Sequence, residues 1–192
     1  MSRGIGGIEA LRSFLPGWAI DAFAVLTTLG DTVFLLAVFL ALYWFYDRDQ
    51  GAIALVVFLG GVVLITALKT ALALPRPPAS VRIVTETYYG FPSGHAFGAT
   101  VGFGLLALVL RTPGRPVRVA LAAVAVLVVS ASRVAIGVHY VVDVVAGVAL
   151  GLAYLAVAWH VAWPRRKALA DAIDRARDRR AHELARRGHE SW

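Results

Sequence analysis

The chain of 192 residues contains no cysteine and few charged side chains. The absence of cysteine excludes disulfide bridges and thiolate metal ligands. Charged residues make up 16% of the sequence and hydrophobic residues 59%, whereas a typical soluble domain has about 25% charged residues. The stretch before Pro16 lacks the sustained apolar core of a cleavable signal peptide, so we expect none. The composition indicates one compact domain built for lipid.

Long apolar runs fill most of the chain. Five segments approach the length of about 20 apolar residues that a membrane-spanning helix needs. They are 32–46, 51–74, 93–110, 116–136 and 140–163. The segment 11–29 is interrupted by Pro16 and Gly17 and carries Asp21, so we interpret it as a helix lying at the membrane interface. The sequence predicts an all-α fold, a multi-pass transmembrane helix bundle of about five spans plus this N-terminal interfacial helix.

The chain divides into an N-terminal interfacial segment (1–30), a transmembrane domain (31–163) and a basic helical tail (164–192). The tail carries nine basic and five acidic residues and so accounts for +4 of the net charge of +7. A basic tail directly after an apolar run is typical of a topology determinant that contacts lipid headgroups, and we do not expect nucleic-acid binding. Further arginines on the same side are Arg48, Arg111, Arg115 and Arg118. The positive-inside rule therefore predicts that this side is cytoplasmic and that the N-terminus lies outside.

Consecutive spans alternate in direction, which brings four span ends to the outer face. The polar residues at these ends are Lys69, Arg76, Ser93, His95, Arg133, His139 and Asp143. Taken singly, each has an ordinary explanation: Lys69 can extend to the interface, and Arg133 with Asp143 can form a structural ion pair. Taken together, ionisable groups at membrane depth indicate a functional site.

The motif FPSGHAF combines a helix start with a histidine. Pro92 ends a loop, Ser93 is a good N-cap, and Gly94 leaves room for a ligand in the first turn. A helix N-terminus binds anions through its free N–H groups and its dipole, and His95 stands beside it.

His139 and Asp143 are four residues apart, so on a helix they share one face. A carboxylate there accepts one ring N–H and makes the other nitrogen more basic. Together with three cations this suits phosphoryl transfer, in which His139 attacks phosphorus and His95 protonates the departing oxygen. Asp143 is the only carboxylate in the spans near this cluster, which disfavours a magnesium-dependent mechanism. We predict neither a metal nor another cofactor.

Three linked motifs carry a family resemblance. Lys69 is followed after six residues by Arg76-Pro77, Pro92-Ser93-Gly94-His95 comes next, and Ser132-Arg133 is followed after five residues by His139 and after three more by Asp143. This pattern closely resembles the type 2 phosphatidic acid phosphatase family, within the superfamily that includes the vanadium haloperoxidases. Many members have six spans, whereas here the first is reduced to the broken segment 11–29.

The resemblance implies a role for each residue. Phosphate is held by Lys69, Arg76, Ser93, Gly94 and Arg133. His139 is the nucleophile, Asp143 is its partner, and His95 is the general acid. The implied protein is an integral-membrane phosphatase that hydrolyses a lipid phosphomonoester or diphosphate through a phosphohistidine, without a metal.

Candidate substrates are phosphatidic acid, phosphatidylglycerophosphate-like lipids and polyprenyl diphosphates. The long outer loop from Pro75 to Pro92 offers side chains that could select a headgroup, namely Arg82, Glu86, Tyr88 and Tyr89. Two alternatives remain: a phosphotransferase that uses the same intermediate, and a transporter or proton channel. The charges gather at one face instead of crossing the membrane, which disfavours the channel. The expected partners are the lipid substrate and membrane lipids, and the oligomeric state stays open.

Overall fold

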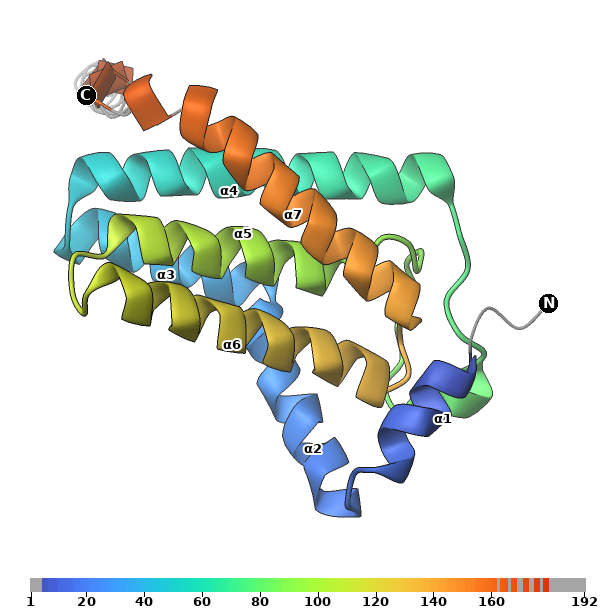
Figure 1. Ribbon diagram of the computed structural model, residues 1–192. Coiled ribbons are helices and arrows are strands. Elements are labelled where there is room, and N and C mark those ends of the chain that lie inside the picture. The colour runs from blue at the N-terminus through green and yellow to red at the C-terminus, as the bar shows by residue number, and fades with distance from the viewer. Residues whose placement is uncertain are drawn as a thin grey trace, which may run out of the picture.

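The computed structural model describes residues 5–161, 163–165, 167–168, 171–172, 175–176 and 178–179. Within this part of the chain all regular structure is helical (Figure 1). The α-helices are α1 (Ile5–Ser13), α2 (Gly17–Leu26), α3 (Thr32–Phe45), α4 (Arg48–Leu72), α5 (Gly94–Val109), α6 (Arg115–Ala135) and α7 (Val141–Val161). Short 3-10 turns are η1 (Thr27–Gly30), η2 (Ala79–Val81) and η3 (Trp163–Arg165). The predicted all-α bundle is confirmed, whereas the predicted tail helix lies largely outside the described residues.

Helices α3 to α7 occupy the five predicted spans, but they differ in length. Only α4, α6 and α7 are long and apolar enough to cross a membrane by themselves in the described part of the chain. Helix α3 has 14 residues and α5 has 16. At about 1.5 Å per residue, α3 covers about 21 Å of a hydrocarbon core that is about 30 Å thick. The bundle therefore combines three full-length helices with two shorter ones.

The segment predicted as a single interfacial helix, 11–29, is instead two helices. Helix α1 ends at Ser13, α2 begins at Gly17, and the two are bent by 117° at this break. Pro16 causes the break because its extended backbone, with φ −68° and ψ 153°, lies outside the helical region and its ring nitrogen has no proton to donate. The interfacial placement of this segment remains a prediction.

Helix α5 lies in the middle of the bundle and contacts α3, α4, α6 and α7 (Figure 1). Its inner face joins a core whose largest buried members are Leu35, Phe39, Phe58 and Phe97. Helices α6 and α7 instead present large apolar side chains outward, among them Leu121, Leu127, Val145 and Leu152. An outward apolar face of this kind suits lipid, because acyl chains are as apolar as leucine.

Glycines allow α7 to approach α5 closely. A Cβ atom at Gly147 would lie 2.5 Å from the Ser93 carbonyl oxygen, and one at Gly151 would lie 2.7 Å from Thr100 Cβ. Gly102 of α5 faces Leu35 of α3. The close approach at Gly147 matters for function because it brings the start of α7 against the start of α5.

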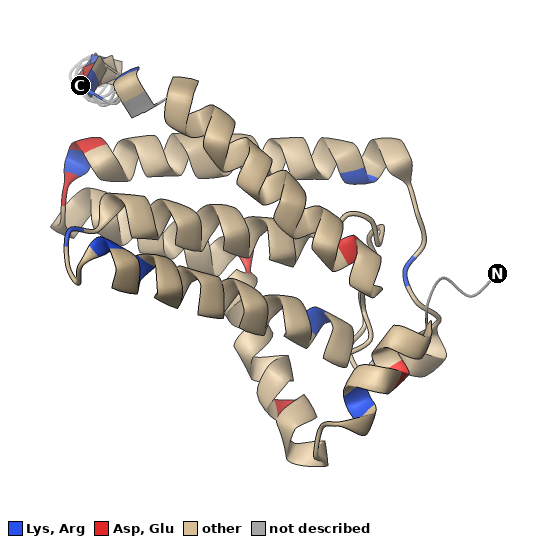
Figure 2. Ribbon diagram, viewed as in Figure 1, with Lys and Arg blue, Asp and Glu red and all other residues tan. Residues whose placement is uncertain are grey.

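Along α4 to α7 the charged residues lie toward the two ends of the bundle, with apolar helix between them, and further charged residues lie on α1 and α2 (Figure 2). At one end, Arg111 of the α5–α6 connection pairs with Asp47 of the α3–α4 turn at 3.2 Å. At the other end the C-termini of α4 and α6 meet the N-termini of α5 and α7, which is the convergence predicted from alternating spans (Figure 1).

Candidate active site

The eight predicted site residues come together at this second end of the bundle. Lys69 lies in the last turn of α4, and Arg76 lies in the following loop. The remaining six are Ser93, Gly94 and His95 at the start of α5, Arg133 in the last turn of α6, His139 in the α6–α7 turn and Asp143 in the first turn of α7. Five of the eight, Lys69, Ser93, Arg133, His139 and Asp143, are buried. Polar side chains so placed beside apolar helices need partners, and the structure provides them.

The start of α5 is capped and tied to α7. The Ser93 hydroxyl accepts a hydrogen bond from the Ala96 N–H at 3.4 Å, and the Ser93 N–H donates to the Asp143 carbonyl at 2.9 Å. A Cβ atom at Gly94 would lie 3.3 Å from Cε of Lys69, so glycine lets the lysine pass beside the helix N-terminus. The lysine Nζ donates to the Tyr89 carbonyl at 2.8 Å. A cation and a helix N-terminus therefore lie side by side.

His139 is held between a carboxylate and a guanidinium. Its Nδ1 lies 3.4 Å from Asp143 Oδ2, and its Nε2 lies 3.2 Å from Arg76 Nη1. A guanidinium only donates hydrogen bonds, so Nε2 is the acceptor and Nδ1 carries the proton. His139 precedes α7, so the prediction that it shares a helix face with Asp143 is wrong. The position of the Asp143 carboxylate is fixed instead by the Tyr140 N–H, which donates to Asp143 Oδ2 at 3.0 Å.

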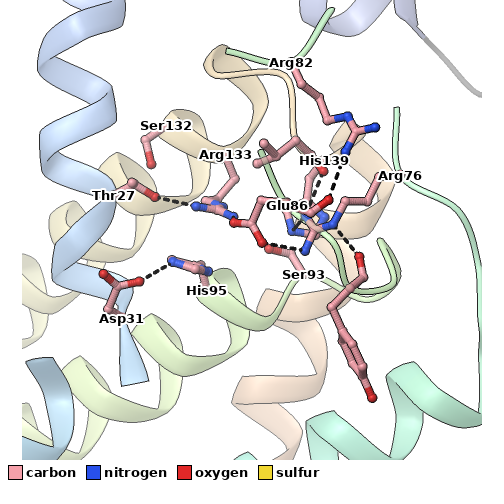
Figure 3. Close-up of polar contacts among 12 residues, drawn as sticks. Thr27, Asp31, Arg76, Arg82, Glu86, Ser93, His95, Ser132, Arg133 and His139 are labelled. Atoms are coloured by element: carbon pink, nitrogen blue, oxygen red, sulfur yellow. Dashed lines mark hydrogen bonds and ion pairs between the residues drawn. The ribbon is translucent and has the colours of Figure 1, made fainter. Parts of the chain in front are cut away.

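Burial lowers the pKa of His139 well below its ordinary value, and the positive charges of Arg76 and Arg133 lower it further. The imidazole is therefore neutral at neutral pH. Its unprotonated Nε2 points toward Arg76, among the cations of the site (Figure 3). A neutral imidazole with an unprotonated Nε2 and an oriented N–H has the form that a nucleophile or a base requires.

Glu86 bridges the two arginines of the site. Its Oε1 accepts from Arg133 Nη2 at 2.5 Å, and its Oε2 accepts from Arg76 Nη2 at 3.1 Å (Figure 3). Burial acts to raise the pKa of Glu86, but the hydrogen bond from Arg133 and the charges of both arginines outweigh it and lower that pKa. The sequence singled out Glu86 only as a loop residue that could select a headgroup, yet a carboxylate here occupies an anion-binding position between two cations.

Two further residues of the cluster come from the corner before α3. Asp31 Oδ1 accepts a hydrogen bond from His95 Nε2 at 2.7 Å, and the Thr27 hydroxyl accepts one from Arg133 Nη1 at 3.1 Å (Figure 3). Neither residue belongs to the site predicted from the sequence. The alternation of spans was a usable signal, because it places the start of the segment 32–46 on the same outer face as His95 and Arg133.

Beside these residues lies a cavity of about 170 Å³. Lys69, His95, Thr66 and Tyr88 are among its polar lining residues, and Phe58 and Phe97 are among its apolar ones. Among the described residues, no group of three or more histidine and carboxylate side chains is arranged to hold a metal ion. The cavity therefore places one cation, Lys69, beside apolar side chains, an arrangement that suits a ligand with an anionic head and an apolar body.

Comparisons with known proteins agree with this arrangement. The family model of the PAP2 superfamily matches residues 50–167, more than half of the chain. Phosphatidylglycerophosphatase B of Bacillus subtilis is 32% identical over 145 residues, which cover 70% of this chain and 71% of that protein. The decaprenylphosphoryl-5-phosphoribose phosphatase of Mycobacterium tuberculosis is 35% identical over 106 residues, covering 55% of this chain and 56% of that protein.

Two solved structures share the fold. The crystal structure of a transmembrane PAP2 type phosphatidylglycerolphosphate phosphatase from Bacillus subtilis matches with a TM-score of 0.71 and 29% identity, over 80% of this chain and 81% of that chain. Aquifex aeolicus LpxE matches with a TM-score of 0.67 over 80% of this chain and 92% of that chain, and its 19% identity supports the fold alone. With the three motifs gathered at one end of a helical bundle, the chain belongs to the PAP2 superfamily and is a membrane phosphatase, a hydrolase of phosphoric esters.

Proposed function

We propose that the protein hydrolyses a lipid phosphomonoester or diphosphate through a phosphohistidine on His139, without a metal ion. The observation that carries this proposal is the environment of the His139 imidazole. Its Nδ1 faces Asp143, and its unprotonated Nε2 lies 3.2 Å from Arg76 within a group of cations. A nucleophile aimed into a cationic pocket is suited to attack an anionic phosphorus centre.

The phosphate is held by cations and by a helix N-terminus. Arg76 and Arg133 already bind a carboxylate, that of Glu86, through one Nη2 each. The Arg133 Nε is buried and has no hydrogen-bond partner among the described residues, so it is a donor available to a ligand oxygen. Lys69 and the first turn of α5, at Ser93 and Gly94, complete the cradle on the side of the cavity.

The chemistry proceeds in two steps. The Nε2 lone pair of His139 forms a bond to phosphorus while the bond from phosphorus to the leaving oxygen breaks, and His95 gives that oxygen its proton. Asp143 stabilises the positive charge that develops on the imidazole. Water then attacks the phosphohistidine while the deprotonated His95 takes one of its protons, the bond from phosphorus to Nε2 breaks, and inorganic phosphate leaves with both histidines restored. The arginines and Lys69 supply the charge stabilisation that a metal supplies elsewhere.

The substrate class follows from the two faces of the site. The cavity places Lys69 and His95 beside apolar walls such as Phe58 and Phe97, so a phosphate can bind at this end of the bundle while its hydrocarbon chain remains in lipid. Two relatives point in the same direction, since one is a phosphatidylglycerophosphatase and the other acts on a decaprenylphosphoryl compound. By the positive-inside rule, the site opens on the extracytoplasmic side and the C-terminal tail is cytoplasmic.

The test is phosphate release by the purified full chain in detergent, with EDTA present. The panel contains phosphatidic acid, phosphatidylglycerophosphate and a polyprenyl diphosphate. We expect release from at least one of them at an unchanged rate when EDTA is added. Absence of release from all three overturns the proposed function, and loss of release with EDTA overturns metal independence.

A lipid phosphotransferase with the same intermediate is the second candidate, because a phosphohistidine can pass its phosphoryl group to an alcohol as well as to water. Product analysis with and without an added acceptor alcohol separates the two. Inorganic phosphate as the only product supports the hydrolase, and a new phosphate ester supports the transferase. Ion flux through proteoliposomes without any phosphate release would favour a channel.

A further inference from the structure

We infer that Asp31 is a positioning residue for the reaction, holding His95 in the orientation and protonation state from which it donates its proton. The inference rests on the proposed function, in which His95 is the general acid. It adds a second histidine–carboxylate pair to the site, contributed by the corner before α3, far in sequence from the three motifs.

The first observation is that the Asp31 side chain does not cap the helix that it precedes. Asp31 is the N-cap of α3, where an aspartate normally accepts a hydrogen bond from the first turn. Its side chain makes no such bond here. Instead the carboxylate accepts a 2.7 Å hydrogen bond from Nε2 of His95, 64 residues away in sequence. The local capping bond has been exchanged for a contact with the site.

The second observation is that the backbone around Asp31 is built to approach His95. A Cβ atom at Gly30 would lie 2.6 Å from Val129 Cγ1 and 3.4 Å from Cδ2 of His95. Any larger residue at Gly30 would push the corner away from the imidazole. The same corner reaches Arg133 through the Thr27 hydroxyl at 3.1 Å. Residues 27–31 therefore hydrogen-bond to two side chains of the site, those of His95 and Arg133.

The third observation concerns the protonation of His95. A carboxylate can only accept at Nε2, so Nε2 carries a proton, and the proton that reaches the leaving oxygen must come from Nδ1. Figure 3 shows His95 between Asp31 on one side and the Arg133–Glu86 pair on the other. Beside one cation, Arg133, and a second carboxylate, Glu86, the negative charge of Asp31 favours the doubly protonated imidazole that a general acid requires, and so opposes burial and the charge of Arg133.

The contact contributes little to folding, which makes it suitable for mutation. The Asp31 side chain is 46% exposed and that of His95 is 22% exposed. Ion pairs in such partly solvated settings add little to stability. We therefore expect the Asp31→Asn variant to fold, and Asp21→Asn, which removes an exposed carboxylate from α2, is the matched control.

The experiment compares two substrates that share the phosphoryl group and differ in the leaving group. Phosphatidic acid has an alkoxide leaving group that needs a proton, whereas p-nitrophenyl phosphate releases a stable phenolate. We expect Asp31→Asn to lower kcat on phosphatidic acid by about 10- to 100-fold with KM little changed, and on p-nitrophenyl phosphate by less than about 3-fold. Asp31→Glu restores part of the loss. In a His95→Ala background, Asp31→Asn has no further effect, because the two residues act as a unit.

Each result decides between the possibilities. An equal loss on both substrates, or losses that add in the His95→Ala background, indicates a merely structural role and overturns the inference. Activity of Asp31→Asn equal to that of Asp21→Asn overturns it while leaving the proposed function intact. If the unmodified chain releases phosphate from none of the three lipids of the panel, the proposed function and the role of Asp31 fall together.

Discussion

The carboxylate of Glu86 accepts a 2.5 Å hydrogen bond from the Arg133 guanidinium, at the position where the proposed mechanism requires a phosphate oxygen. The same carboxylate reaches Arg76 at 3.1 Å. Glu86 lies in the outer loop, which is anchored on either side: Arg82 donates to the Glu86 carbonyl at 2.9 Å, and the Ile83 N–H donates to the Ile136 carbonyl at 3.0 Å. An acid from the loop thus competes for the cations that the substrate needs.

Replacing Glu86 by glutamine removes this competing charge and retains the shape of the side chain. We expect inorganic vanadate and phosphate to inhibit the Glu86→Gln variant at concentrations about 3- to 10-fold lower than the unmodified protein, because both arginines are released for the anion. The measurement is the inhibition constant in the phosphate-release assay. Glu9→Gln, at an exposed carboxylate on α1, is the control. A weaker affinity of Glu86→Gln for vanadate would show that Glu86 organises the cradle instead of competing for it.

The lowered pKa of Glu86 predicts a pH dependence of stability. A carboxyl whose pKa is lower in the folded state stabilises the fold above its ordinary value of 4.5, and that contribution is lost as the pH falls through the folded value. We expect the melting temperature in detergent to decrease below pH 4.5 more steeply for the unmodified protein than for Glu86→Gln. Parallel curves for the two proteins would remove Glu86 from this transition.

His139→Ala is expected to abolish turnover, with a loss of at least about 1,000-fold, because no other group replaces the nucleophile. The variant should still elute from size exclusion as the unmodified protein does. Rapid quenching with a radiolabelled substrate should trap a phosphoprotein that is labile in acid and stable in base. A labelled His139→Ala protein, or normal phosphate release by it, contradicts the assignment.

Asp143→Asn tests the orientation and charge of the nucleophile. The amide retains an oxygen near the Tyr140 N–H but cannot stabilise the positive imidazole that forms when His139 is phosphorylated. We expect kcat to fall by about 100-fold or more, with a smaller change in KM. Unchanged kinetics would show that Asp143 serves only to connect α7 with the start of α5 through its carbonyl.

Removal of the basic tail, by ending the chain before Arg165, should affect membrane insertion more than chemistry. We expect a lower yield of inserted protein, with kcat of the inserted fraction within about twofold of the full chain, because the tail supplies a topology signal and headgroup contacts. Membrane fractionation and the release assay provide the two measurements. A well-inserted but inactive truncation would contradict this interpretation.

Much of the fold was predictable because its information is local. Each apolar run from 32–46 to 140–163 became a helix, since a segment surrounded by lipid must satisfy its own backbone hydrogen bonds. Alternation of these helices placed the ends of α4 and α6 beside the starts of α5 and α7, so the clustering of His95, Arg133 and His139 followed from topology. The break at Pro16 was visible, but the bend of 117° was not, because it depends on how α1 packs against its neighbours.

The helical runs, the three spaced motifs and the end of the bundle at which their side chains meet all follow from the order of residues along the chain. Which groups touch there depends on how the helices and the outer loop pack. The Asp31 side chain bonds His95 instead of capping α3, and Glu86 of the long outer loop pairs with two arginines. Such contacts depend on distances set by packing, including close approaches such as that of Gly147 to Ser93. They leave no periodic pattern along the chain, because their partners are brought together by folding and not by spacing.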